Sequence, residues 1–199
     1  MKKLWFLLMT IPMLGQPSDT TFVRLSDYSD QFIYDMRYAT RDNFLKSAVY
    51  PCGECMLRYA TVKALIAANE EFLAKGFRIR IFDCYRPLDV QKKMWALVSN
   101  PLYVADPAKG SIHNRGGAVD ITLVDADGNT LEMGTDFDHF GPESGVTYKG
   151  ISRRAQKNRK LLSKVMARHG FEVLPSEWWH YNYKNARNLP VSNQGWPCP

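Results

Sequence analysis

The segment Gly117-Ala118-Val119-Asp120-Ile121-Thr122-Leu123-Val124 decides the fold, because its apolar and β-branched residues predict a buried strand. The Asp127-Gly128 pair that follows is a hairpin-turn signal, so we expect a short return strand near residues 130–132. Asp120 is the unexpected residue of the segment. A lone buried carboxylate is costly unless it is paired or binds a metal.

Helical and extended patterns on both sides of this segment predict the other elements. Apolar residues recur at helical spacing through residues 59–75. Apolar and polar residues then alternate through residues 77–83, as in a half-buried strand. The further expected elements are a helix that opens at Pro87, a helix over residues 152–169, and strands over residues 171–174 and 178–183. The rest is expected to be irregular: residues 17–58, 100–110 and 133–150.

Length and composition indicate one globular domain. The 199 residues are 45% hydrophobic and 23% charged, close to globular averages. This composition excludes a disordered chain, a collagen, a coiled coil and a multi-span membrane protein. Because helices alternate with hairpin-connected strands, we expect a single α+β domain with a central, mainly antiparallel sheet flanked by helices.

The first residues have the pattern of a secretory signal. Lys2 and Lys3 form a short positive region, and the eleven residues 4–14 are an apolar run broken only by two residues. A bilayer span needs about 20 residues, so this run is too short. We predict a signal peptide over residues 1–15 and a mature domain over residues 16–199 that is exported to the bacterial periplasm. No Cys follows the run, so a lipid anchor is not expected; the alternative is an N-terminal core segment.

The charge of the chain favours no particular polymer as a partner. The net charge is +6, and it becomes +4 when the two units of Lys2 and Lys3 are removed. The densest basic stretch, residues 153–160, looks like the solvated face of a helix. Nucleic-acid binding is therefore not expected, although a mildly basic surface suits an anionic partner such as a cell wall.

The four cysteines, Cys52, Cys55, Cys84 and Cys198, allow three full pairings, among which the sequence cannot choose. Cys52 and Cys55 have the spacing of a redox pair or half a zinc knuckle. No second pair completes a zinc site, and no thioredoxin-like context surrounds them. In an oxidising compartment we expect one or two disulfides, with Cys52 or Cys55 bonded and without a part in catalysis.

Two of the four histidines have neighbours that suggest a metal site. His113 precedes Asp120 by seven residues, and glycines at 116 and 117 let the intervening chain turn sharply. His180, flanked by aromatic residues, could supply a third ligand. Two histidines and one carboxylate leave a fourth position open on tetrahedral zinc, which is the catalytic pattern. The alternatives are that Asp120 caps a turn or pairs with an arginine, and that His180 is a satisfied core histidine.

Glu177 is the candidate general base, because a carboxylate beside activated water can accept its proton and return it to a leaving amine. In a regular strand, however, residues 177 and 180 face opposite sides. We therefore expect Glu177 to lie in a turn before the strand, which Pro175 favours. The alternative is a surface glutamate.

Arg86 falls where a strand ends and a helix begins. Its planar, permanently charged guanidinium group could stabilise the oxyanion of a tetrahedral intermediate. The alternative is a salt bridge to Asp83 or Asp89, and Arg86 considered alone favours that alternative.

Together these contexts resemble the zinc D-alanyl-D-alanine dipeptidases of the VanX type, within the zinc D-Ala-D-Ala peptidases. The similarity runs from about residue 50 to residue 183. The pattern S-x-H-x-x-G-x-A-x-D is met at residues 111–120, E-W-W-H at 177–180 and Y-R-P at 85–87, and residues 133–138 resemble the M-G-T-x-F-D segment. The cysteines and the tail at residues 196–199 depart from the family pattern.

The resemblance implies a role for each site residue. It implies one zinc ion with ligands His113, Asp120 and His180, Glu177 as the base, Arg86 as the oxyanion stabiliser, and Ser111 and Asp138 as residues that hold the substrate. A carboxylate such as Asp138 suits the free ammonium of a dipeptide, although Asp136 is an equally charged neighbour.

The sequence therefore predicts an exported zinc enzyme that cleaves the small dipeptide D-Ala-D-Ala into two D-alanines. The nearest rival is a D,D- or L,D-carboxypeptidase that acts on longer cell-wall peptides. A rival of another class is a non-catalytic, zinc-dependent wall-binding module, which would have no need of Glu177.

Overall fold

The central strand, β5 (Ala118–Val124), is the predicted buried strand, and all seven of its residues are buried. The computed structural model describes residues 16–196 and Cys198, and the predicted signal segment at residues 1–15 lies outside them. The five-stranded sheet has the order β2-β4-β5-β7-β6, with β2 at Ile33–Tyr34, β4 at Arg78–Asp83, β7 at Glu177–Tyr183 and β6 at Phe171–Leu174. The β2–β4 pair is parallel and the other pairs of this sheet are antiparallel, which confirms the α+β prediction.

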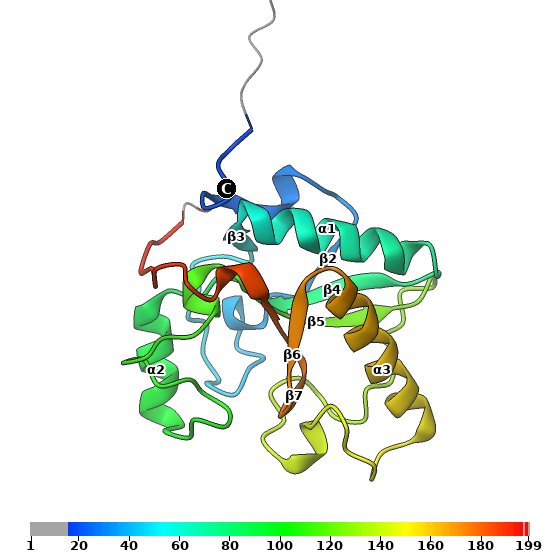
Figure 1. Ribbon diagram of the computed structural model, residues 1–199. Helices are drawn as coiled ribbons and strands as arrows, with labels where there is room; N and C mark the ends of the chain where they lie inside the picture. The colour runs from blue at the N-terminus through cyan, green and yellow to red at the C-terminus, as the bar shows by residue number, and fades with distance from the viewer. Residues whose placement is uncertain (1–15, 197, 199) are drawn as a thin grey trace, which may run out of the picture.

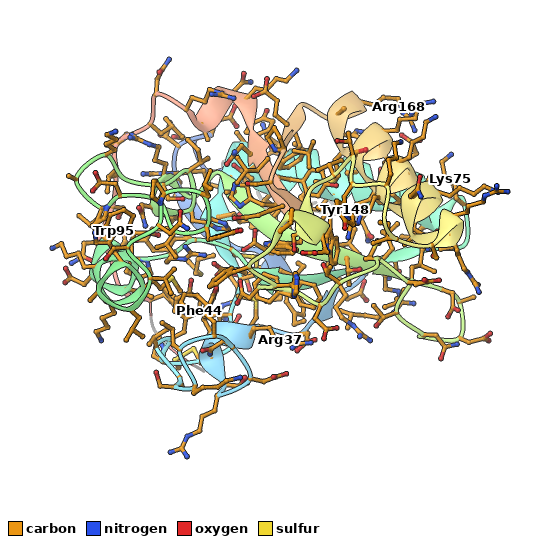
Figure 2. The ribbon with its side chains drawn as sticks, turned by 90° about the horizontal axis from the view of Figure 1, so that it is seen from below. Arg37, Phe44, Lys75, Trp95, Tyr148 and Arg168 are labelled. Carbon is orange, nitrogen blue, oxygen red and sulfur yellow. A yellow bond between two sulfur atoms is a disulfide. The ribbon has the colours of Figure 1, made fainter. Side chains whose placement is uncertain are left out.

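The structure has three α-helices in its described residues: α1 (Tyr59–Leu73), α2 (Leu88–Leu97) and α3 (Arg153–Arg168). Helices α1 and α3 cover one face of the five-stranded sheet. Helices α1 and α3 contact each other and the strands, whereas α2 lies at the other end of the molecule (Figure 1). Glu71 of α1 pairs with Arg168 of α3 and with Lys75, and Figure 2 shows both cations at the same end of the molecule. Among the described residues, no helix combines the length and the apolar character needed to cross a membrane.

The prediction of an irregular segment before residue 59 is wrong in part, because it contains short strands. Strand β1 (Phe22–Arg24) pairs antiparallel with β3 (Met56–Arg58) in a two-stranded sheet, and β2 is the parallel edge strand of the main sheet. Runs of two or three residues are too short for an alternating pattern to be detected. The expected return strand after β5 is reduced to a single bridge between Val124 and Thr130.

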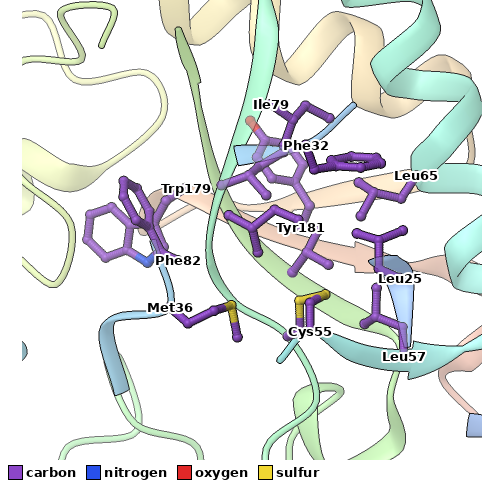
Figure 3. Packing of buried hydrophobic residues seen from close by; sticks show 14 of the residues in the cluster. Leu25, Phe32, Met36, Cys55, Leu57, Leu65, Ile79, Phe82, Trp179 and Tyr181 are labelled. Carbon is purple, nitrogen blue, oxygen red and sulfur yellow. A yellow bond between two sulfur atoms is a disulfide. The ribbon is translucent and has the colours of Figure 1, made fainter. Parts of the chain in front are cut away.

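The main core lies between the sheet and the two helices. Figure 3 shows Leu65 of α1 and Leu57 of β3 facing Ile79 of β4 and Tyr181 of β7, and all four side chains are almost completely buried. Their burial removes apolar surface from water and stabilises the packing of α1 and α3 against the sheet. The sheet is thereby held rigidly from one face, which leaves the other face to carry the site.

Two disulfides bond all four cysteines. Cys55 bonds Cys84 across 29 residues, and Cys52 bonds Cys198 across 146 residues. The expectation of disulfides is confirmed, and the Cys52–Cys55 spacing is not a redox pair, because each of these residues bonds a distant partner. The Cys55–Cys84 bond attaches β3 to the end of β4, where Arg86 follows.

We predict that replacing both Cys55 and Cys84 by Ser lowers the free energy of unfolding by about 3 to 4 kcal/mol, because a loop of this length then regains its entropy in the unfolded chain. Urea denaturation of the oxidised wild-type and variant proteins measures this difference. An unchanged denaturation midpoint would contradict the prediction.

Candidate metal centre and active site

Three residues from separate elements meet at one point on the open face of the sheet. Asp120 of β5 lies directly opposite His180 of β7 in the strand register, and His113 comes from a short 3-10 turn before β5. Their facing atoms form a triangle: Asp120 Oδ1 to His180 Nδ1 is 3.0 Å, Asp120 Oδ1 to His113 Nε2 is 3.3 Å, and His113 Nε2 to His180 Nδ1 is 3.1 Å. All three residues are buried.

The turn that delivers His113 depends on the glycine after it. Gly116 ends the turn with a φ of 71°, a left-handed conformation that glycine adopts without strain. A Cβ at Gly116 would also lie 2.4 Å from the ring of Phe22. The sharp turn expected between His113 and Asp120 is therefore present.

Hydrogen bonds on the outer side of both rings fix which nitrogen faces the triangle. His113 Nδ1–H donates to the backbone carbonyl of Cys84 at 2.6 Å, and His180 Nε2–H donates to the side-chain oxygen of Asn182 at 2.9 Å. The inner nitrogens then present lone pairs to each other and to the Asp120 carboxylate. Three acceptors that face one another at such distances repel unless a cation lies between them.

The size of the triangle fits a small transition-metal ion. With metal–nitrogen bonds of about 2.05 Å, tetrahedral geometry separates the ligand atoms by about 3.3 Å. Burial raises the pKa of Asp120, but the contacts with His113 and His180 lower it much further, so that Asp120 is a carboxylate. His113, Asp120 and His180 can therefore hold a metal ion, as the sequence suggests.

Glu177 and His180 line the same cavity although their spacing suggested opposite faces. The reason is an irregularity between β6 and β7. Val173 pairs with Tyr181, whereas the next residue, Leu174, pairs with Glu177, so the residues between them on β7 bulge out of the regular register. Glu177 is thus the first residue of β7 rather than part of a preceding turn, which corrects that expectation.

The environment of the Glu177 carboxyl group disfavours its charged form. Its side chain is buried, and this burial raises its pKa to about 8, although His180 lowers it in part. A carboxyl group that gains and loses a proton near neutral pH suits a general base that later acts as an acid. The surface-glutamate alternative does not hold.

Arg86 makes the salt bridge considered for it and also lines the cavity. Its Nε and Nη2 donate to Asp83 Oδ2 at 3.2 and 2.6 Å, and Nη1 donates to Gln91 at 2.9 Å. Asp83 also accepts hydrogen bonds from Tyr50 and from the Cys84 backbone. A guanidinium has five N–H donors, so this fixed Arg86 keeps donors for a ligand.

Ser111 and Asp138 complete the polar lining of the cavity. The Tyr38 hydroxyl group lies 3.1 and 3.0 Å from the two oxygens of Asp138, whose φ of 59° is tolerated by Asp. Burial, and then the charge of Asp120, raise the pKa of Asp138 to about 8. Asp136 is exposed and lies outside this cavity, so Asp138 is the acidic residue that faces it.

The cavity has a volume of about 250 Å³, which is below the usual range of pockets for drug-sized ligands, about 300 to 1,000 Å³. Its walls include residues that the sequence analysis missed, among them Tyr38, Phe44 and Asn182. Phe44, labelled in Figure 2, and Tyr38 come from the loop between β2 and β3, which shows no sequence pattern. The sequence does contain a clue to Asn182, because a residue two positions after His180 on a strand lies on the same face.

A buried centre of two histidines and one carboxylate, with a buried glutamate in the same cavity, defines a metallopeptidase type of site. Residues 18–197 match the model of the peptidase M15 family, described as D-ala-D-ala dipeptidase, and the chain belongs to this family.

Individual relatives agree with this assignment. The D-alanyl-D-alanine dipeptidase of Escherichia coli K12 is 35% identical over 91% of this chain and 94% of its own length. The D-alanyl-D-alanine dipeptidase of Enterococcus faecium is 31% identical over 83% of this chain and 91% of its own length. The D-alanyl-D-alanine dipeptidase of Enterococcus faecalis is 30% identical over 74% of this chain and 84% of its own length.

We predict that Asn182→Ala lowers metal affinity by about 10 to 100-fold, because the His180 ring loses the acceptor that orients it. His180→Ala should lose the metal on dialysis. Both are measured by metal analysis after competition with a chelator. An Asn182→Ala protein with wild-type affinity would mean that the outer hydrogen bond does not orient the ligand.

Proposed function

We propose that the protein is a zinc-dependent dipeptidase that hydrolyses D-alanyl-D-alanine into two D-alanines. The observation that carries the proposal is the lining of one small cavity by the metal triad, Glu177, Arg86 and Asp138 together. Family membership supports the substrate, because the family and its relatives are described as D-Ala-D-Ala dipeptidases.

One zinc ion per chain fits the donor set. His113, Asp120 and His180 would hold it, since two imidazoles and a carboxylate at these separations are the ligands of catalytic zinc. When bound, zinc supplies Lewis-acid polarisation of a carbonyl group and a lowered pKa for water.

Glu177 and Arg86 perform the steps that the protein itself contributes. Glu177 accepts a proton from the attacking water and delivers it to the nitrogen of the leaving D-alanine. Its buried carboxyl group, with a pKa of about 8 before any cation is bound, is suited to carrying that proton. Arg86, immobilised by Asp83, directs its remaining N–H groups at the oxygen on which negative charge develops.

Asp138 and Ser111 hold the substrate. The free ammonium of a dipeptide would form an ion pair with Asp138 and lower its raised pKa, because an adjacent cation favours the carboxylate. Tyr38 keeps that carboxylate in position. Ser111 lies two residues before the ligand His113 and lines the cavity, where its hydroxyl group can donate to the substrate.

A D,D- or L,D-carboxypeptidase is the second candidate, and one observation favours it. A larger depression of about 1,020 Å³ adjoins the active-site cavity, and Phe44 and Asp138 line both. A longer peptide needs such a space beyond the position of the ammonium. A non-catalytic wall-binding module is disfavoured, because burying the Glu177 carboxyl group without a catalytic use only destabilises the fold.

Export to the periplasm remains our proposal for the location. Two disulfides on four cysteines suit an oxidising compartment. The signal pattern over residues 1–15 supports the same conclusion, with residues 16–199 as the mature domain.

The decisive assay compares two substrates with the zinc-loaded protein. We expect rapid release of D-alanine from D-Ala-D-Ala and little from an N-acetylated tripeptide that ends in D-Ala-D-Ala. Preference for the tripeptide would identify a carboxypeptidase, and the absence of hydrolysis of both would identify a binding module.

We predict that Glu177→Gln lowers kcat by about 10² to 10⁴-fold with little change in KM, because glutamine keeps the shape but cannot accept the proton. Steady-state kinetics measures the two constants, and metal analysis checks that zinc is retained. Loss of zinc would make Glu177 a ligand, and wild-type turnover would place the base elsewhere.

We predict that Asp138→Asn raises KM for D-Ala-D-Ala by at least about tenfold, since the ammonium loses its charged partner. Hydrolysis of N-acetylated substrates should not fall. Asp136→Asn is the matched control for the dipeptide, because Asp136 lies outside the small cavity and lines only the larger depression, so KM for D-Ala-D-Ala should stay unchanged. Equal losses on free and blocked substrates would contradict the role of Asp138.

A further inference from the structure

The C-terminal segment, residues 187–196 with Cys198, crosses the loops that carry the site, and we call it the strap. Ser192 is its central contact. Its backbone N–H donates to the carbonyl of Asn114 at 2.8 Å, and its carbonyl accepts the Leu88 N–H at 3.2 Å. The strap carbonyl of Leu189 also accepts a hydrogen bond from the side chain of Arg115. The strap therefore joins the start of α2 to the turn that carries His113.

Asn114 connects the strap to the backbones of Ser111 and Arg86. It is fully buried, its Oδ1 accepts the Ser111 N–H at 2.7 Å, and its Nδ2 donates to the Arg86 carbonyl at 2.8 Å. One side chain thus joins two loops that are distant in sequence. If Asn114 moved, the backbones of Ser111 and Arg86 would lose a shared anchor, because buried amide groups need their partners.

A second route from the strap also ends at Arg86. The buried ring of Trp196 packs against Tyr50 at 5.3 Å and against Tyr85 at 5.9 Å between centroids. The hydroxyl group of Tyr50 donates to Asp83 at 2.7 Å, and Asp83 pairs with Arg86. Contacts of this kind hold a side chain by packing and hydrogen bonding together.

The Cys52–Cys198 disulfide fastens the end of the strap. Cys198 is exposed, whereas Cys55 and Cys84 are almost completely buried. A mild reductant therefore reaches the Cys52–Cys198 bond and spares the other. Without this bond, the end of the strap is held by the packing of Trp196 and by backbone hydrogen bonds, so it opens more often.

We propose that the strap and Asn114 are positioning elements of the enzyme, and that the Cys52–Cys198 disulfide keeps them in place. The strap fixes Asn114 and Tyr50, and these residues fix Ser111 and Arg86 for substrate binding and oxyanion stabilisation. The proposal rests on the proposed function for the roles of Ser111 and Arg86. Its consequence is that full activity requires the oxidised strap, which links the cysteines outside the family pattern to catalysis.

The test uses the zinc-loaded, oxidised protein and its Cys198→Ser variant. Hydrogen exchange measures the amides of residues 110–116, and kinetics measures KM and kcat on D-Ala-D-Ala. We expect faster exchange confined to the strap, to residues 110–116 and to the Leu88 amide, which donates to the strap. We also expect a higher KM from the displacement of Ser111 and a lower kcat from the displacement of Arg86, at unchanged zinc content. The combined loss in kcat/KM should be about five to twentyfold, the equivalent of one or two hydrogen bonds.

Three comparisons separate positioning from general destabilisation. Wild type under mild reductant should reproduce Cys198→Ser without any substitution, and Asn114→Leu should change KM and kcat in the same direction with the disulfide intact. Gln194→Ala is the matched control, because Gln194 is an exposed strap residue that takes part through its backbone. Its exchange and kinetics should equal those of wild type.

Two outcomes would overturn the proposal. Exchange at residues 110–116 and kcat/KM that both stay at wild-type values in Cys198→Ser would show that the strap holds nothing. Faster exchange throughout α1 and α3 as well would show a general stabilising role only. If the wild-type enzyme did not hydrolyse D-Ala-D-Ala, the proposed function would fail, while the exchange experiment would still decide whether the strap holds the loop.

Discussion

The contact between Asp120 and His180, 3.0 Å across the β5–β7 pair, is the constraint on which the rest of the site depends. It places a carboxylate in the middle of a strand whose residues are all buried. A charge in that position is tolerated only if its neighbours compensate for lost hydration. His113, delivered by the turn before β5, places a third ligand atom beside this pair, and a cation bound among the three would supply the compensation. The same arrangement that lets the fold bury Asp120 therefore also creates a place that can hold a metal ion.

Four buried or partly buried acids around the cavity divide into two pairs with opposite environments. Asp83 pairs with Arg86, and Asp120 faces the two histidines. Glu177 and Asp138 have no such partner, and burial raises the pKa of each to about 8. Acids in such different environments are suited to different tasks. The first pair is held by basic neighbours, whereas the proposed functions of the second pair, proton transfer by Glu177 and ammonium binding by Asp138, need groups that are not already neutralised.

The sequence predicted those parts of the molecule in which residue type and spacing have a direct physical meaning. The buried strand at β5 and the helices α1 and α3 follow from periodicity. The cost of burying Asp120 suggested a metal site, and the resemblance to the family implied the full set of His113, Asp120 and His180. The strands β1, β2 and β3 were missed, because two or three residues show no period. The bulge that brings Glu177 and His180 into one cavity could not be predicted either, since a register shift depends on the pairing of β6 with β7. Tyr38 and Phe44 lie in a loop whose course depends on tertiary packing.

Most of the residues that would touch a substrate lie on loops or at strand ends rather than inside elements. Ser111 and Asp138 are on loops, Arg86 follows the end of β4, and Glu177 begins β7. Loops lose much conformational freedom when they are ordered, and hydrogen bonds along a regular ladder do not hold them. Both disulfides end beside these segments, one at Cys84 next to Asp83 and one at the end of the strap. Covalent bonds thus supply, for the loops, the order that the sheet supplies for Asp120 and His180.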